Sequence, residues 1–213
     1  KTLMREKQYE LEFGVHSYLD IMDHKVFVRH FWNHRPTNIM RNGLKSDVFL
    51  RAIGNFFYTN YEEVLLFLKK LKSIKYKSFA KQLFVLGEDL RIEEECKRER
   101  KGTVQAFQIR KQIYWDYFRS QQTVNVVKSV YTDALFNTIY VMLTAETPVF
   151  DIPSFNEEIN LAFPFIQKQV MNFFDAKSTA DIARNTLELM EVIDEVLEHD
   201  MLNEYFHLPE KMM

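Results

Sequence analysis

Apolar residues recur at helical spacing through most of the chain, and the longest apolar stretch covers residues 123–146. Only two residues between 134 and 143 are polar, and a helix that is apolar nearly all round is normally buried. Thr123 can cap the start of this stretch, and Pro148 stops it at the other end. We therefore predict one central buried helix of about six turns.

The same periodicity predicts helices along the rest of the chain. They cover residues 2–22, 23–34, 46–60, 61–71, 78–101, 103–122, a stretch starting at 154, and 178–205. We expect a loop at Asn42-Gly43, a capping box from Ser154 to Glu157, and a kink or restart near Pro164. No alternating strand pattern fits better than the helical one, and residues 207–213 are expected to form a tail.

Composition supports long helices and a large core. The 213 residues include only five Gly and five Pro, and 46% are hydrophobic. We find no fixed internal repeat, which disfavours a regular solenoid. The sequence therefore predicts an all-α fold, a single-domain helical bundle of about seven to nine helices over residues 1–213.

The net charge of −2 conceals two oppositely charged parts. Residues 1–144 hold 24 Lys and Arg against 16 Asp and Glu, whereas residues 145–213 hold 4 against 14. This pattern suggests a possible subdivision into a basic part, 1–147, and acidic C-terminal helices, 148–213. The two parts could pack on each other, join molecules head to tail, or meet different partners.

Several features favour a soluble, cytoplasmic (intracellular) protein. No run of 18 apolar residues is present, so we expect no transmembrane segment. The charged N-terminal residues do not resemble a secretory signal. A single cysteine, Cys96, excludes a disulfide framework, and its charged neighbours predict that it is exposed.

One group of residues has the spacing of metal ligands. On a helix, His16, Asp20 and His24 would lie at i, i+4 and i+8 and present their side chains on one face. The same spacing recurs at Glu191, Glu195 and His199. The hypothesis is a helical-bundle enzyme with iron or manganese; the alternative is ordinary surface histidines with carboxylate partners, and no other cofactor is predicted.

Residues 29–34, RHFWNH, consist of an arginine, a polar residue, three further residues and a histidine. This segment resembles the active motif of the HEPN family of helical ribonucleases, in which two motifs meet across a dimer. The resemblance implies that Arg29 stabilises phosphate charge, that His34 moves the 2′-hydroxyl proton, and that the protein is a homodimer. The alternative is that Phe31 and Trp32 are packing residues and Arg29 is a surface charge.

The densest basic stretch lies at residues 69–81. It contains Lys69, Lys70, Lys72, Lys75, Lys77 and Lys81. Lysines neutralise phosphates and nearby aromatic rings can stack on bases, so nucleic-acid binding is one hypothesis. A solvated helical face, an anionic membrane surface or an acidic protein partner would use the same residues.

The common nucleotide, redox and zinc-protease motifs are absent from the sequence. The leading hypothesis is therefore a non-enzymatic protein-interaction or regulatory module with basic and acidic helical faces and protein partners. The ribonuclease, the metal-dependent enzyme and the nucleic-acid-binding protein are the alternatives.

Overall fold

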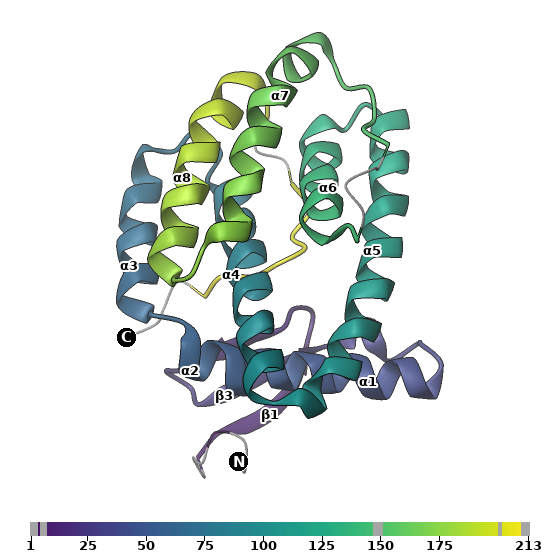
Figure 1. Cartoon of the computed structure of the whole chain (residues 1–213), viewed down its shortest axis with the longest axis vertical. Coiled ribbons are helices and arrows are strands. Elements are labelled where there is room, and N and C mark those ends of the chain that lie inside the picture. The colour runs from purple at the N-terminus through teal and green to yellow at the C-terminus, as the bar shows by residue number, and fades with distance from the viewer. Residues whose placement is uncertain (1–3, 5–7, 147–150, 200–201, 210–213) are drawn as a thin grey trace.

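The computed structural model describes residue 4 and residues 8–146, 151–199 and 202–209. Long helices stand side by side, and a small sheet and α1 lie across one end of them (Figure 1). The predicted helical bundle is confirmed. The described residues also contain three strands, so the prediction that the fold has none is wrong.

The sheet consists of β1 (Glu10–Gly14), β2 (Tyr18–Asp20) and β3 (Lys25–Arg29). Its order is β1-β3-β2, with β3 parallel to β1 and antiparallel to β2. The helices are α1 (Thr37–Phe49), α2 (Phe56–Tyr58), α3 (Tyr61–Lys70), α4 (Lys77–Glu99), α5 (Val104–Val127), α6 (Tyr131–Thr144), α7 (Glu157–Met171) and α8 (Thr179–Val196). None of the helices in the described ranges has the length and apolar character needed to cross a bilayer.

The predicted helices at 2–22 and 23–34 are wrong where the chain is described; residues 2–3 and 5–7 lie outside the described residues. In β3, Val26 and Val28 are buried and alternate with half-buried neighbours, as expected for a strand with one face on the core. Branched and aromatic residues favour this extended backbone. His24, at φ 54°, turns the chain between β2 and β3.

The predicted central helix is two helices. Ser129 has a φ of 57°, and the Val130 N–H donates to the Asn125 carbonyl at 2.8 Å, so α5 ends and α6 starts in a new direction. Every residue of α6 except the half-buried Tyr131 is buried, which confirms the core role predicted for this stretch. The proposed stop at residues 147–148 lies outside the described residues.

Asn42 and Gly43 lie inside α1, so the predicted loop is wrong. A Cβ on Gly43 would come within 2.2 Å of the Trp32 ring, and the glycine therefore allows close packing rather than a turn. After α1 the helical path continues through a π-helical segment, Leu50–Asn55, into α2. Helix α1 thus starts nine residues before the predicted start at Ser46.

The last two helices follow the prediction in part. Asn156 rather than Ser154 caps α7, and α7 continues through Pro164. Ser178 and Asp181 form a capping box at the start of α8, which agrees with the predicted start at residue 178. Helix α8 ends at Val196, and the chain beyond it returns to the core, where Tyr205 and Phe206 are buried.

Candidate functional site

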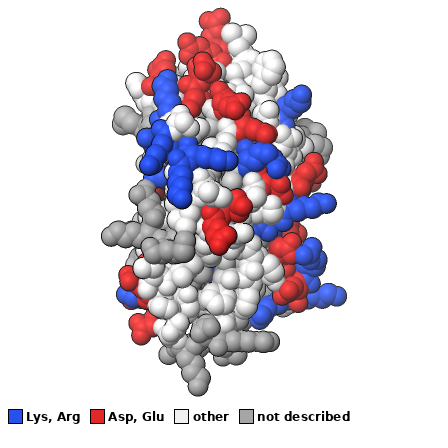
Figure 2. Space-filling model, turned by 90° about the vertical axis from the view of Figure 1, so that its left-hand side faces the viewer, with Lys and Arg blue, Asp and Glu red and all other residues white. Residues whose placement is uncertain are grey.

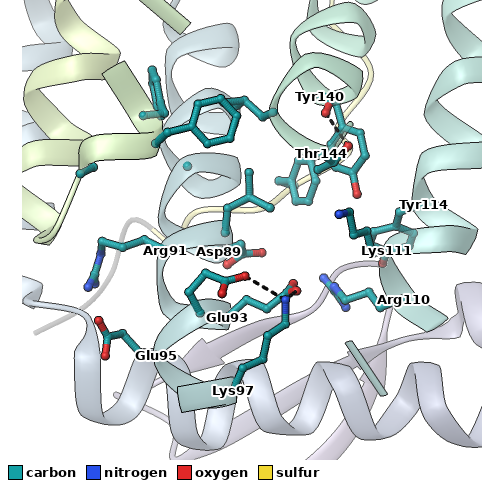
Figure 3. A pocket seen from close by; sticks show the side chains of 18 of the residues that line it. Asp89, Arg91, Glu93, Glu95, Lys97, Arg110, Lys111, Tyr114, Tyr140 and Thr144 are labelled. Atoms are coloured by element: carbon teal, nitrogen blue, oxygen red, sulfur yellow. Dashed lines mark hydrogen bonds and ion pairs between the residues drawn. The ribbon is translucent and has the colours of Figure 1, made fainter. Parts of the chain in front are cut away.

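A cleft of about 620 Å³ opens between α4, α5, α6 and the connection from α7 to α8 (Figure 3). Its floor consists of buried apolar and aromatic side chains. These are Tyr114, Tyr140, Leu143, Phe173 and Phe206. Ligand sites are typically concave, largely apolar and of this volume, so the cleft is the candidate functional site.

Helix α4 supplies the charged wall of the cleft. Glu93 and Lys97 are one turn apart and form an ion pair at 2.5 Å, and Lys97 also pairs with Glu94 at 2.9 Å. Burial raises the pKa of the Glu93 carboxyl, although the Lys97 ammonium opposes this rise. Glu93 and Glu94 therefore share Lys97 as their partner.

Two buried ion pairs each contribute one residue to the cleft lining, Arg110 and Asp89. Arg110 of α5 donates to Asp47, which also accepts from the Trp32 indole N–H at 3.0 Å. Arg51, from the π-helical segment, donates to both oxygens of Asp89, at 2.6 and 2.8 Å. These pairs attach α5 to α1, and α4 to the π-helical segment that follows α1.

A few polar groups in the cleft lack a firm partner. The Tyr140 hydroxyl forms no hydrogen bond with any described residue; Thr144 donates to the Tyr140 carbonyl instead. Burial raises the pKa of this phenol well above its usual range, so it stays a neutral donor. Lys111 lies 3.8 Å from the carboxylate of Glu146, whose side chain is 83% exposed. The exposed Lys177 completes this set at the rim.

The arrangement suits binding better than covalent chemistry. Cys96 does not line the cleft, and it is buried, so the prediction that it is exposed is wrong. Burial raises the pKa of its thiol to about 12, which disfavours the reactive thiolate. Within the described ranges, no group of three or more His, Cys, Asp or Glu side chains is placed to hold a metal ion.

The three predicted metal ligands do not share a helix face, because the helix that would have aligned them is a sheet. His16 follows β1 and lies 3.3 Å from Glu204; His24 packs edge-on against Tyr9. Asp20, in β2, accepts the Asp23 N–H. The geometric basis of this prediction is therefore absent.

Arg29 and His34 are not on a helix either. Arg29 ends β3, and its guanidinium donates to the Tyr114 hydroxyl at 3.1 Å and to the Val15 carbonyl at 3.3 Å. His34 is exposed in the turn before α1. The arginine therefore joins the sheet to α5, and the helical setting that the ribonuclease resemblance implies is not present.

The predicted lysine patch lies on the end of α3, the start of α4 and the turn between them. Five of its members are exposed, and Lys81 is half-buried. Figure 2 shows this side of the molecule, where basic side chains gather next to acidic ones. Lys70 lines the same hollow as Glu191 and Glu195 of α8, and Asp194 accepts the Lys75 N–H at 2.9 Å. The patch is thus bordered by carboxylates.

The sequence did not reveal the cleft. Residues 93–101 are rich in charge, a composition typical of a solvated helix, whereas Glu93 is buried. The sequence feature that points to the cleft is the i, i+4 spacing of Glu93 and Lys97 on a helix whose earlier residues are largely apolar. That spacing alone does not identify the helices that complete the cleft.

Fold and cleft together define a helical bundle with a deep, mixed-charge cleft. The chain is 46% identical over 211 residues to "Uncharacterized protein YojO" of Bacillus subtilis (strain 168). The match covers 99% of this chain and 33% of the relative, so the chain spans about a third of the length of the curated relative that it matches. No protein-family model and no solved structure matches the chain.

Proposed function

We propose that the chain is a non-enzymatic, intracellular protein-interaction module and that its cleft receives a segment of a partner protein. The observation that carries the proposal is the cleft itself, a concave space of about 620 Å³ with an aromatic floor and charged walls. This combination gives a peptide both apolar contact area and polar groups that fix its orientation.

The pairing of charges supports a binding role over catalysis. A general acid or base must be free to exchange a proton with a substrate. Glu93 is bound to Lys97 and Asp89 is bound to Arg51, and each pair would have to break first. These charges serve the architecture of the cleft.

Phe174 supports a protein partner in particular. It lies at the rim of the cleft, between α7 and α8, and is 57% exposed. Exposed aromatic rings beside a concave surface are typical anchors of protein interfaces. The neighbouring Lys177 adds a charged contact at the same rim.

A peptide library displayed on phage tests the proposal, with enriched peptides measured by isothermal titration calorimetry. We expect Phe174→Asp to weaken binding of the enriched peptides at least about tenfold, because it places a charge on the apolar rim. The matched control is Phe165→Asp, a phenylalanine of α7 that is 65% exposed and does not line the cleft.

The control should bind the peptides as the wild type does. The proposal is wrong if the library yields no specific peptide, or if the enriched peptides bind the Phe174→Asp variant as tightly as the wild type.

A further inference from the structure

We infer that the cleft contains a carboxylate-binding subsite, formed by the Tyr140 hydroxyl, the free edge of the Arg110 guanidinium and the Lys111 ammonium. The occupant is an Asp or Glu side chain of the partner segment. That a partner protein supplies the carboxylate rests on the proposed function. That the subsite binds a carboxylate does not depend on it.

Tyr140 provides the first reason. The residue is 4% exposed, it lines the cleft, and its hydroxyl forms no hydrogen bond with the described residues. Its ring stacks on the Phe118 ring, with 3.9 Å between the ring centroids, and this packing restricts the position of the hydroxyl. A hydroxyl that is held in place at the wall of a cleft, without a partner among the described residues, is available to a ligand acceptor.

Arg110 provides the second reason. A guanidinium has five N–H donors, and the hydrogen bonds of Arg110 to described residues, to Asp47 and to Ser46, both come from Nη1. The residue is 5% exposed and lines the cleft, and the Tyr114 ring lies 4.6 Å from its central carbon. Asp47 and Tyr114 thus hold the guanidinium in place and leave its other nitrogens available to a carboxylate.

The three groups converge in space. Figure 3 shows Arg110 and Lys111 reaching from α5, and Tyr140 from α6, toward the space beside α4. Their helices pack closely on each other, since Phe118 of α5 stacks on Tyr140 of α6. A carboxylate in this space would meet a neutral hydroxyl donor and two cations, and it would face Glu93, whose charge is paired with Lys97.

The charge balance of the lining also favours an anion. Most lining charges are paired within the protein, as Arg51–Asp89, Arg91–Glu88, Lys97–Glu93, Arg98–Glu95 and Arg110–Asp47. Lys111 and Lys177 remain on the positive side, because the contact of Lys111 with the exposed Glu146, at 3.8 Å, is weak. Glu94 remains on the negative side, because its partner Lys97 already pairs with Glu93, but the Glu94 side chain is 74% exposed and therefore well screened. The C-terminal end of α6 opposes them with only a fraction of a charge.

Phenylacetate and phenylacetamide test the subsite, because they have similar shape and differ in the charge of one group. Ligand-observed NMR titration should show that wild-type protein binds phenylacetate at least about fivefold more tightly than phenylacetamide. Tyr140→Phe should weaken phenylacetate binding about fivefold and leave phenylacetamide binding unchanged. Tyr140→Phe removes only an unbonded oxygen, so its thermal midpoint should match the wild type.

Tyr117→Phe is the matched control, since Tyr117 lies on α5 and does not line the cleft. Equal affinity for the two probes, or phenylacetate binding that Tyr140→Phe does not change, would overturn the subsite. Enriched phage peptides should also lose affinity when their Asp and Glu become Asn and Gln. If peptides bind the cleft equally well with Asp and Glu or with Asn and Gln, the subsite is refuted but the proposed interaction module is not. If phenylacetate binds but no peptide does, the subsite exists but a partner protein does not supply its carboxylate.

Discussion

A single buried carboxylate, Asp47, joins three parts of the molecule. It accepts hydrogen bonds from Arg110 of α5, from the Trp32 indole and from the Arg29 backbone N–H of β3. It is fully buried, so its charge is compensated only by these donors. Removing one partner of a buried pair leaves the other charge uncompensated, which costs far more than loss of a surface pair.

We therefore expect Asp47→Asn to lower the free energy of unfolding by about 3–5 kcal/mol in urea titrations. Asp116→Asn is the control, because Asp116 is exposed and its carboxylate accepts a hydrogen bond from the Gln112 side chain at 3.2 Å. Its effect on the free energy of unfolding should stay within about 0.5 kcal/mol. A loss below about 1 kcal/mol for Asp47→Asn would show that the carboxylate does not have this central role.

Two glycines offer a second test at the scale of single residues. Gly43→Ala should cost about 1–3 kcal/mol, because its Cβ would overlap the buried Trp32 ring. Gly102→Ala meets no atom within 4 Å and should be neutral or stabilising by about 0.4–1 kcal/mol. Thermal unfolding of both variants measures the difference, and equal midpoints would contradict the packing role of Gly43.

Among the elements, the segment 202–209 is held against the sheet by a histidine pair. His16 and His207 stack at 5.8 Å, and both contact the carboxylate of Glu204, at 3.3 and 2.7 Å. Burial lowers the pKa of His16, and the charges of Arg29 and His207 act in the same direction, while Glu204 opposes them. The pKa of Glu204 is itself lowered, despite its partial burial, by its histidine partners.

The sign of the pH effect follows from these directions. Because the folded-state pKa of His16 lies below its unfolded value of 6.5, the unfolded chain binds more protons as the pH falls below about 7. The lowered pKa of Glu204 acts in the same direction, but mainly at lower pH, because its unfolded value is 4.5. The folded state should therefore be less stable at pH 5.5 than at pH 7.5.

We expect the free energy of unfolding to fall between pH 7.5 and 5.5, and His16→Gln to reduce this fall. His34→Gln, a change at an exposed histidine, should leave it unaltered. Urea titrations at both pH values measure the effect. A wild type of equal stability at both values would show that His16 does not couple protonation to folding.

The elements also show what the sequence could and could not predict. Helix α6 was predictable because its apolar residues run without interruption. The break before it was not, since it depends on a positive φ at Ser129, a residue that rarely adopts one. The strands were not predicted because the apolar residues between 10 and 29 also fit a helical spacing. The pairing of the strands with one another, which decides between the two, is not visible in that spacing.

At the scale of the whole molecule, the basic and acidic parts share one core. The main hydrophobic cluster extends from Trp32 to Phe206 and includes residues of α3, α4, α6, α7 and α8. Gly87 of α4 lies so close to α8 and its preceding turn that an added Cβ would be 2.7 Å from Phe173. The opposite charges of the two parts therefore meet within one fold.

We predict a single cooperative thermal transition with equal calorimetric and van't Hoff enthalpies. Intrinsic fluorescence and far-UV circular dichroism should give the same midpoint. Two separate transitions would indicate that residues 148–213 form an independent unit, the subdivision that the charge pattern suggested.

The cleft belongs to this scale as well, which explains why the sequence did not predict it. Its lining runs from Gly87 to Phe206, and its polar groups come from helices that are distant in the chain. Spacing along one helix can predict Glu93–Lys97, but only tertiary packing brings Tyr140 of α6 next to α5. Burial of a hydroxyl without a partner is likewise a property of the folded state.

The burial of α6 from Thr132 to Thr144 has a kinetic consequence. Its amide hydrogens can exchange with deuterated solvent only when the surrounding helices separate, so the slowest-exchanging amides of the protein should lie in α6. Their exchange rates would report the global opening free energy without any denaturant. The amide exchange rates of α6 would thus measure how often the whole molecule opens.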